Sequence, residues 1–305
     1  MPATTVVVVT WRGAAHVTAC LDGLAAQTRP HRTIVVDNAS DDGTARLLAE
    51  HPSRPEVLRL PRNGGYAGGI AAALSRVDTE FVAWLNDDAV PEPGWLAALE
   101  DAAGPRVAAV ASRLTYVGGR VQSVGVGLTP DGHGRDLTEG VPFGFCGGAA
   151  LLRTAALRAV GGVPADFFCY YEDTDTAWRL RLAGWEIVTA PDAVVRHEHG
   201  ASTHPGSARF HRWNERNRLL MLLRCAPALV ALRELARFAA ITAALPLRTI
   251  LRRQVPDAAN FRVALRCRVL ADVAVRLPAA LRARRDVGRR SVVRRGVLWR
   301  RWAAG

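Results

Sequence analysis

Hydrophobic and polar positions follow two alternating periods along the first part of the chain. Residues 5–9 are a β-branched run typical of a buried strand, and apolar residues then recur at helical spacing between 17 and 24. The same alternation predicts further strands at 33–36, 57–60, 81–85 and 107–111, and helices at 43–50, 69–76 and 93–103. This βαβα order predicts an α/β fold with a mainly parallel sheet covered by helices on both faces.

The pattern changes twice further along. Residues 115–140 are rich in Gly and Thr and predict a hairpin or loop excursion, followed by a strand at 145–152, a helix at 172–183 and short strands at 185–189 and 193–197. After about residue 203, Arg recurs among Leu, Ala and Val at helical spacing, which predicts basic amphipathic helices. We therefore predict an α/β domain over 1–220 and a basic helical C-terminal region over 221–305.

The charge changes the picture of the C-terminal part. The chain carries a net charge of +12 and no Lys, and residues 205–305 hold 23 Arg against five acidic residues. Such a segment binds phosphates, whether of an anionic membrane, a nucleic acid or a phosphorylated carrier lipid. We expect an anionic membrane surface and no nucleic acid, because no nucleic-acid-binding motif is present. The alternative is that these helices pack on the α/β domain or on a second subunit, as in a homodimer.

Other features of the sequence indicate the compartment. The five Cys are scattered without zinc-site spacing, which favours reduced thiols in the cytosol. The N-terminus lacks a basic signal region, and no uncharged apolar stretch is long enough to span a bilayer. We expect a cytoplasmic protein, peripheral at the inner face of the plasma membrane, with Trp299 and Trp302 entering the interface between Arg residues.

Polar clusters follow four of the predicted strands. In an open parallel sheet the carboxyl ends of the strands meet at one edge, where ligands bind. Each cluster alone is also typical of a turn, but their coincidence favours a site. The clusters contain Thr10, Trp11 and Arg12; Asp37 and Asn38; Asn63 and Gly65; and Asn86, Asp87 and Asp88.

Two phosphate-binding motifs are absent from the sequence, and their absence limits the classes of protein to which this predicted crevice could belong. No GxGxxG follows the first strand and no phosphate-binding loop with Lys exists, which excludes P-loop NTPases and disfavours Rossmann oxidoreductases. Adjacent carboxylates at 87 and 88 offer another way to hold a diphosphate, through a divalent cation. His197 follows a short strand, and with Asp88 it would suit Mg²⁺ or Mn²⁺.

A second acidic cluster starts the helix predicted at 172–183. Acidic residues stabilise the first turn of a helix through its dipole, so Glu172, Asp173 and Asp175 have a purely structural interpretation. Three carboxylates in four residues are more than the dipole requires. The functional interpretation is a general base that faces the same crevice.

The order of these segments resembles the family 2 glycosyltransferases with the GT-A fold, and the rhamnosyltransferase-like branch in particular. The resemblance covers roughly residues 4–220 and implies an inverting, metal-dependent transfer from a nucleotide-sugar donor. It rests on VVVVTWRG, VDNASDDGT, NGGYAGG, WLNDDAVPEPGWL, FGFCGGAALLRTAALRAVGG, FFCYYEDTDTAWRLRLAGW and APDAVVRHEHGAS.

The resemblance also implies a role for each candidate residue. Asp173 would be the catalytic base, with Glu172 supporting it or contacting the acceptor, and Asp88 with His197 would hold the metal. The donor site would comprise Thr10, Trp11, Arg12, Asp37, Asn38, Asn63, Gly65, Asn86, Asp87, Gly147 and Gly148.

Three departures from the family pattern and several alternatives accompany these roles. Asn86 replaces the first acid of the metal motif, Trp11 stands where Tyr is more usual and is followed directly by Arg12, and His199 competes with His197 as ligand. The expected donor is dTDP-rhamnose, with UDP-galactofuranose and UDP-hexoses as alternatives, and the acceptor would be a glycan, a cell-wall polymer or a lipid-linked sugar. The rivals from another class are a non-catalytic nucleotide- or sugar-binding relative and a basic membrane- or nucleic-acid-binding protein.

Overall fold

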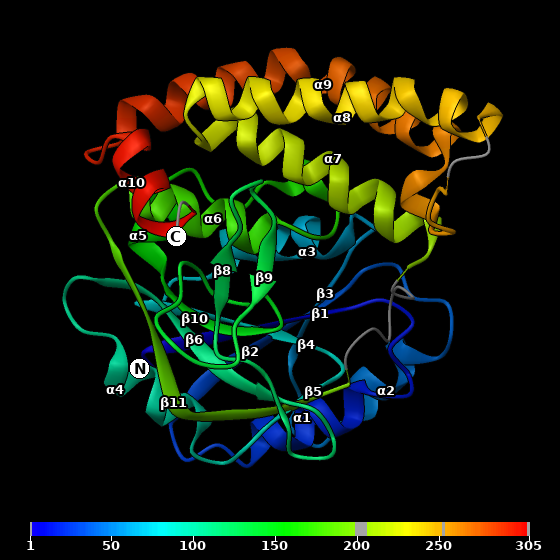
Figure 1. The fold of residues 1–305 in the computed structure, drawn as a ribbon. Helices are drawn as coiled ribbons and strands as arrows, with labels where there is room; N and C mark the ends of the chain where they lie inside the picture. Colours follow the sequence, from blue (N-terminus) through cyan, green and yellow to red (C-terminus); the bar gives the residue numbers. More distant parts are fainter. Residues whose placement is uncertain (1, 199–205, 252–253, 304–305) are drawn as a thin grey trace.

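The central feature of the fold is a mixed sheet covered by helices (Figure 1). The computed structural model describes residues 2–198, 206–251 and 254–303. Within these ranges the sheet has nine strands in the order β3-β2-β1-β4-β10-β6-β11-β5, with β7 paired to β6. Its strands are β1 (Thr4–Thr10), β2 (His31–Asp37), β3 (Glu56–Arg59), β4 (Phe81–Asn86), β5 (Ala89–Pro91), β6 (Val107–Thr115), β7 (Val121–Ser123), β10 (Ala149–Arg153) and β11 (Glu186–His197).

The direction of the strands changes in the middle of the sheet. Strands β3, β2, β1 and β4 are all parallel, as the βαβα pattern predicts. β10 lies antiparallel between β4 and β6, and β6 pairs in parallel with β11. The chain entering β10 therefore comes from the same edge at which β1, β2 and β4 end, which brings residues 146–148 to that edge.

Helices cover both faces of the sheet, as predicted. On one face, α1 (Val17–Ala25) and α4 (Trp95–Ala102) pack against the side chains of Val6 and Val8. On the other face, Val7 and Val9 belong to a core shared with the remaining helices. These include α3 (Gly65–Ala73), α5 (Thr154–Ala159), α6 (Glu172–Leu182), α7 (Ala208–Cys225), α8 (Ala228–Ile250), α9 (Val263–Arg290) and α10 (Arg295–Trp302); α2 (Thr44–Glu50) follows β2.

Several elements differ from the predicted ones. The segments predicted as two strands at 185–189 and 193–197 form the single strand β11, whose register shifts between Ala190 and Val194. β5 directly follows the polar cluster at 86–88, which by itself is typical of a turn. The strand was not predicted, because three residues are too few to show a period. The excursion at 115–140 contains β7 and the hairpin β8 (Val126–Leu128) and β9 (Gly134–Asp136).

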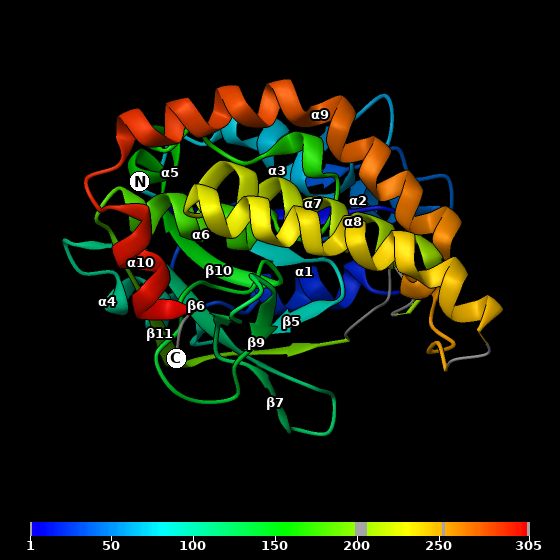
Figure 2. The same cartoon turned by 45° about the horizontal axis from the view of Figure 1, so that its top comes forward.

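The C-terminal helices form a layer over the second face of the sheet (Figure 2). α7 crosses the domain boundary predicted between residues 220 and 221 and packs extensively on α9 and α6. α8 and α9 lie outermost (Figures 1 and 2). None of the helices in the described ranges has the length and hydropathy needed to cross a bilayer.

The tryptophans of α10 contact other aromatic residues. Trp299 stacks on Trp178 with ring centroids 5.9 Å apart, and Trp302 meets Phe143 edge to face at 5.8 Å. Both residues pack against the main core, because burying an indole there removes a large apolar area from water. Both side chains are half-buried in this arrangement, and their entry into a membrane interface stays a prediction.

Candidate active site

The carboxyl ends of the parallel strands border a cavity of about 640 Å³. A volume of this size is typical of a small-molecule site. The predicted residues that line it are Trp11, Asn38, Asn63, Gly65, Asn86, Asp87, Asp88, Gly147, Gly148, Glu172, Asp173 and His197. The predicted donor, metal and base positions thus border one space.

Three predicted donor residues do not line the cavity. Thr10 donates a hydrogen bond of 2.6 Å to Oδ2 of Asp87, which orients that carboxyl group. Asp37 is fully buried and pairs with Arg59 at 2.6 Å. Arg12 forms an exposed ion pair with Asp41. In this arrangement Thr10 supports a lining residue, Asp37 is buried away from the cavity, and Arg12 lies at the surface.

The turn after β3 is held by a side chain from β2. Asn38 donates from Nδ2 to the Gly65 carbonyl at 2.9 Å and accepts from the Gly64 amide at 2.8 Å. Gly65 has a φ of 74°, and a Cβ there would lie 2.1 Å from the Phe168 carbonyl oxygen. Only glycine fits this position. The cluster interpreted as a turn is therefore both a turn and a cavity wall.

Asp88 and His197 meet at the pairing of β5 with β11. His197 lies opposite Ala89 in this pairing, and its Nε2 is 3.1 Å from Oδ1 of Asp88. Its Nδ1 is 3.0 Å from Oε1 of Gln122, an arrangement in which Nδ1 donates and Nε2 keeps a lone pair. Both Asp88 and His197 are buried.

These residues fit a divalent cation. Oδ1 of Asp88 is buried without a hydrogen-bond donor among the described residues and lies 3.1 Å from Nε2 of His197, which is also 3.2 Å from Nδ2 of Asn86. Burial, together with the neighbouring Asp88, raises the pKa of Asp87 to about 6. No three His, Cys, Asp or Glu side chains converge as a metal site among the residues that the structure describes. His199, the alternative ligand, lies outside the described residues.

Asp173 stands at the N-terminus of α6. Its Oδ2 accepts from the Gly147 amide at 2.9 Å, and its Oδ1 accepts from the amide and hydroxyl of Thr174. Burial raises the pKa of Asp173, and these hydrogen bonds offset part of that effect. The hydroxyl of Tyr66 donates to the carbonyl of Gly147, the residue whose amide contacts Asp173.

Glu172 has a different environment although it is adjacent. Its side chain is buried, and Oε2 has no hydrogen-bond partner within the described residues. Burial and the charge of Asp173 raise the pKa of Glu172 well above its usual value. Both effects disfavour the charged carboxylate, and a protonated Glu172 can donate a hydrogen bond to a ligand.

The loop before α6 is held in an unusual conformation. Phe168, Tyr170 and Tyr171 all have positive φ, at 68°, 73° and 68°. The side-chain amide of Asn217 on α7 donates to the carbonyls of residues 167, 169 and 170 at 2.8–2.9 Å. Backbone strain of this kind persists only where the surroundings impose it. α7 is thus part of the support of the candidate base.

Sequence reasoning missed a group of cavity residues, and the reasons differ. Gln122 and Arg135 lie in the excursion at 115–140, where no period marks an inward-facing position. Arg209, Phe210 and Trp213 lie at the start of α7, where the Arg-rich texture predicted only a basic helix. The positions missed are Tyr66, Gln122, Arg135, Asp136, Tyr170, Arg209, Phe210, Trp213 and Asn214.

Gly147 and Gly148 leave room in the cavity. A Cβ on either residue would approach its nearest protein atom to 3.4 Å, which is ordinary contact. The space that these glycines leave open therefore belongs to the ligand side of the wall.

Comparisons with protein families and with proteins of known name agree with the resemblance seen in the sequence. The model of "Glycosyl transferase family 2" matches residues 5–161. The pre-mycofactocin glycosyltransferase of Mycobacterium tuberculosis is 31% identical over 200 residues, which cover 61% of this chain and 41% of that protein. The N-acetylglucosaminyl-diphospho-decaprenol L-rhamnosyltransferase of M. tuberculosis is 28% identical over 235 residues, which cover 65% of this chain and 76% of that protein. The chain thus spans less than half the length of the first relative.

A solved structure supports the fold. The mannosyltransferase PcManGT of Pyrobaculum calidifontis, in complex with GDP-Man and Mn²⁺, superposes with a TM-score of 0.55 at 22% identity, covering 90% of this chain and 86% of that one. At this identity the likeness concerns the fold alone, which is that of GT-A glycosyltransferases.

Proposed function

The chain belongs to glycosyl transferase family 2, and from that premise we propose that it is an inverting, metal-dependent glycosyltransferase that uses a nucleotide-diphosphate sugar. One observation carries the proposal. The candidate base Asp173 and the cation-binding pair of Asp88 and His197 border the same cavity. A single displacement requires both a base for the acceptor and a counter-charge for the leaving group in one space.

Asp173 supplies the base. The acceptor oxygen forms its bond to the anomeric carbon while the bond from that carbon to the diphosphate oxygen breaks, and the acceptor proton passes to Asp173. One displacement inverts the anomeric centre. The raised pKa of Asp173 suits this role, because a base is most effective when its pKa is close to the working pH.

Asp88 and His197 would hold Mg²⁺ or Mn²⁺. When bound, such an ion neutralises the charge that develops on the leaving diphosphate. Gln122 keeps the His197 ring in the orientation that directs Nε2 toward Asp88. The Mn²⁺ in the complex of the structurally similar mannosyltransferase supports this proposal.

The proposed donor is dTDP-rhamnose, and the proposed acceptor is a glycan, a cell-wall polymer or a lipid-linked sugar. Support comes from the relative named as an L-rhamnosyltransferase acting on N-acetylglucosaminyl-diphospho-decaprenol. A UDP-sugar, as in galactofuranosyl or hexosyl transfer, is the second candidate donor.

A thermal-shift and donor-hydrolysis panel tests this function. The purified protein is incubated with dTDP-, UDP- and GDP-sugars in the presence of Mn²⁺, Mg²⁺ or EDTA. We expect one nucleotide to stabilise the protein, and only with metal. If no nucleotide shifts the melting temperature under any condition, the cavity is not a donor site.

We also propose that the outer face of α8 contacts an anionic membrane. Leu229 and Ile250 are 82% and 76% exposed, and Leu232 and Leu247 continue the stripe between them. Exposed arginines flank the stripe, and the one acidic residue of α8, Glu234, is buried. Apolar area edged by Arg suits headgroups of an anionic bilayer at the cytoplasmic face.

A further inference from the structure

Part of the cavity lies outside the donor, metal and base positions. Its mouth is formed by the first turns of α7 and by the β8–β9 hairpin. Two aromatic pairs border it: Phe168 with Trp213, whose ring centroids are 4.6 Å apart, and Tyr170 with Phe210 at 5.1 Å. Flat apolar rings of this kind bind the apolar faces of sugars and other amphipathic groups. The mouth therefore has the character of a binding surface.

Two arginines border the same mouth. Arg135 belongs to β9 and Arg209 to the first turn of α7, and both are exposed. Neither guanidinium forms an ion pair with a carboxylate among the described residues. The guanidinium carbon of Arg209 lies 5.9 Å from the ring centre of Trp213. A cation in the first turn of a helix also opposes the helix dipole, so Arg209 brings unfavourable positive charge there that a bound anion would relieve, although the carboxylate of Asp136 lines the same cavity.

Nearby arginines are paired. Arg212 binds Asp272 at 2.8 Å, and Arg218 binds Glu215 at 3.0 Å. Arg233 lies 3.1 Å from Glu234. The carboxylates of the C-terminal helices are thus used to neutralise arginines away from the cavity, while the two at its mouth keep their donors available.

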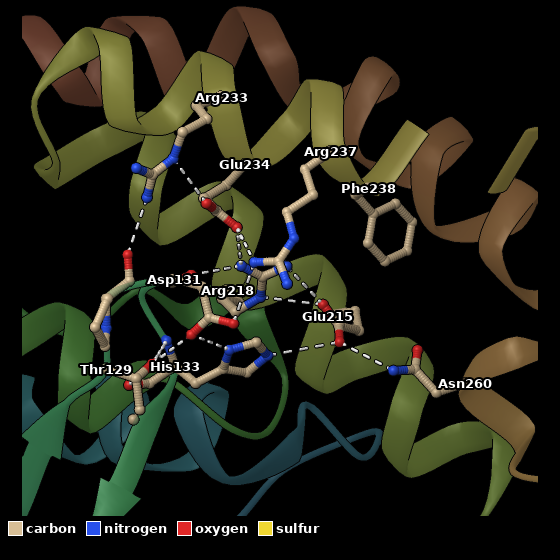
Figure 3. Close-up of polar contacts among 12 residues, drawn as sticks. Thr129, Asp131, His133, Glu215, Arg218, Arg233, Glu234, Arg237, Phe238 and Asn260 are labelled. Atoms are coloured by element: carbon tan, nitrogen blue, oxygen red, sulfur yellow. Dashed lines mark hydrogen bonds and ion pairs between the residues drawn. The ribbon is translucent and has the colours of Figure 1, made fainter. Parts of the chain in front are cut away.

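A partly buried polar cluster links the two elements that carry these arginines (Figure 3). The turn of the β8–β9 hairpin lies between α7 and α8, where Nδ1 of His133 is 3.0 Å from Asp131 and Nε2 is 3.7 Å from Glu215. Arg218 of α7 donates to the Asp131 carbonyl at 2.7 Å, and Arg233 of α8 donates to the Pro130 carbonyl at 3.0 Å.

This cluster joins the hairpin to α7. His133 is two residues from Arg135, and Glu215 lies on the helix that begins beside Arg209. The cluster is therefore a brace that sets how the two walls of the mouth face each other.

We propose that Arg135 and Arg209 form an anion subsite that binds a phosphate group of the acceptor. This inference rests on the proposed glycosyltransferase function. Guanidinium groups match phosphate geometry, and the aromatic pairs would contact the sugar or chain beside the phosphate. The acceptor would then present its hydroxyl to Asp173 and its phosphate to the mouth. The phosphate belongs either to a soluble phosphorylated sugar or to a lipid headgroup.

Calorimetric titrations test the subsite. The probes are glucose 1-phosphate with methyl glucoside as its uncharged counterpart, and farnesyl phosphate with farnesol. Each is titrated into the full chain in EDTA, and again after saturation with Mn²⁺ and the nucleotide found in the donor panel. We expect a phosphate to bind more tightly than its uncharged counterpart, and Arg135→Ala and Arg209→Ala each to weaken that binding about tenfold.

A matched control removes the same charge elsewhere. Arg285 is exposed on α9 and does not border the cavity, so Arg285→Ala should bind both phosphates like the wild type. Binding of glucose 1-phosphate alone supports a soluble source, and binding of farnesyl phosphate alone supports a lipid source. The subsite is overturned if neither phosphate is preferred, or if all three variants bind alike. If phosphate binds but no nucleotide does, the donor function fails and the anion site stands.

Discussion

At the scale of single residues, the two adjacent carboxyl groups of α6 differ in their hydrogen bonds. Asp173 accepts bonds from two backbone amides and a hydroxyl, all of which stabilise its charged form. Glu172 is buried beside it with an unpartnered Oε2. These hydrogen bonds favour the charged form of Asp173, whereas burial and the charge of Asp173 disfavour the charged form of Glu172, so Asp173 is better suited to be the base.

These different environments predict that two isosteric substitutions have different effects on kcat. Asp173→Asn removes the base and should lower kcat by about 10²–10⁴. Glu172→Gln keeps the size and shape of the side chain and leaves the proposed base in place, so it should keep kcat close to that of the wild type at neutral pH. Steady-state kinetics on both variants decides; equal losses would contradict the assignment.

A second pair of substitutions separates the base from the cation site. Asp88→Ala removes one of the two proposed ligands and should weaken donor binding in the presence of Mn²⁺. Asp173→Asn should leave donor binding nearly intact, because it acts on the acceptor. Titration of the donor into each variant is the measurement. Equal loss of donor affinity in both variants would refute the division of roles.

At the scale of elements, the structure depends on contacts between segments far apart in sequence. The β8 and β9 strands have three residues each, too few to hold a hairpin by themselves. The turn is attached by the ion pair of His133 with Glu215 of α7 and by hydrogen bonds that Arg218 of α7 and Arg233 of α8 donate to its carbonyls. Burial would lower the pKa of His133, but its contacts with Glu215 and Asp131 raise it above the ordinary value.

The brace should therefore depend on pH. A raised folded-state pKa means that the stabilisation by His133 is fully present below the unfolded pKa of about 6.5, and is lost as pH rises through the folded value. Burial opposes ionisation of Glu215, yet its contacts with His133 and Arg218 lower its pKa to about 2, so this carboxylate stays charged across that range.

Melting temperatures from pH 6 to 9 test this dependence. The difference between wild type and His133→Gln should shrink as the pH rises, because the neutral imidazole no longer pairs with the carboxylates. A difference that stays constant with pH would show that the charge of His133 does not contribute.

At the scale of the whole molecule, the C-terminal helices have two faces with different roles. The inner face supports the candidate site, through Asn217 and the braced hairpin. The outer face carries the exposed leucines of α8 between arginines. One helical layer can thus connect a bilayer surface with the mouth of the cavity.

Vesicle flotation tests the outer face. The double substitution Leu232→Ser and Leu247→Ser should abolish flotation with anionic vesicles, because both side chains would leave the apolar interface. Val117→Ser is the control, since Val117 is 65% exposed on a loop between β6 and β7. Binding of the wild type that is equally strong with uncharged vesicles would contradict an electrostatic mode.

The sequence by itself determined the parallel half of the sheet and the edge of the sheet at which the cavity lies. Residues 4–103 alternate between strand and helix periods over short distances, so local patterning decides the elements. The carboxyl-end rule then places Asn38, Asn63 and Asp88 at one edge. A residue that directly follows a strand can be placed from the sequence, because the position of the strand in the sheet also fixes the position of that residue.

Only the tertiary structure decided which residues border the mouth and which lie away from the cavity. Asp37 and Arg12 find charged partners that are distant in sequence, and these pairings hold them away from the cavity. Arg135, Arg209 and Gln122 lie at the cavity because non-local packing brings their segments there. Non-local packing also decides the surroundings of Trp299. The arginines next to it in the sequence favour a membrane interface, but in the structure its ring stacks on Trp178. The periodicity of a segment shows which of its residues are buried. Which other segment they pack against is decided only by the tertiary structure, because those contacts join residues far apart in the sequence.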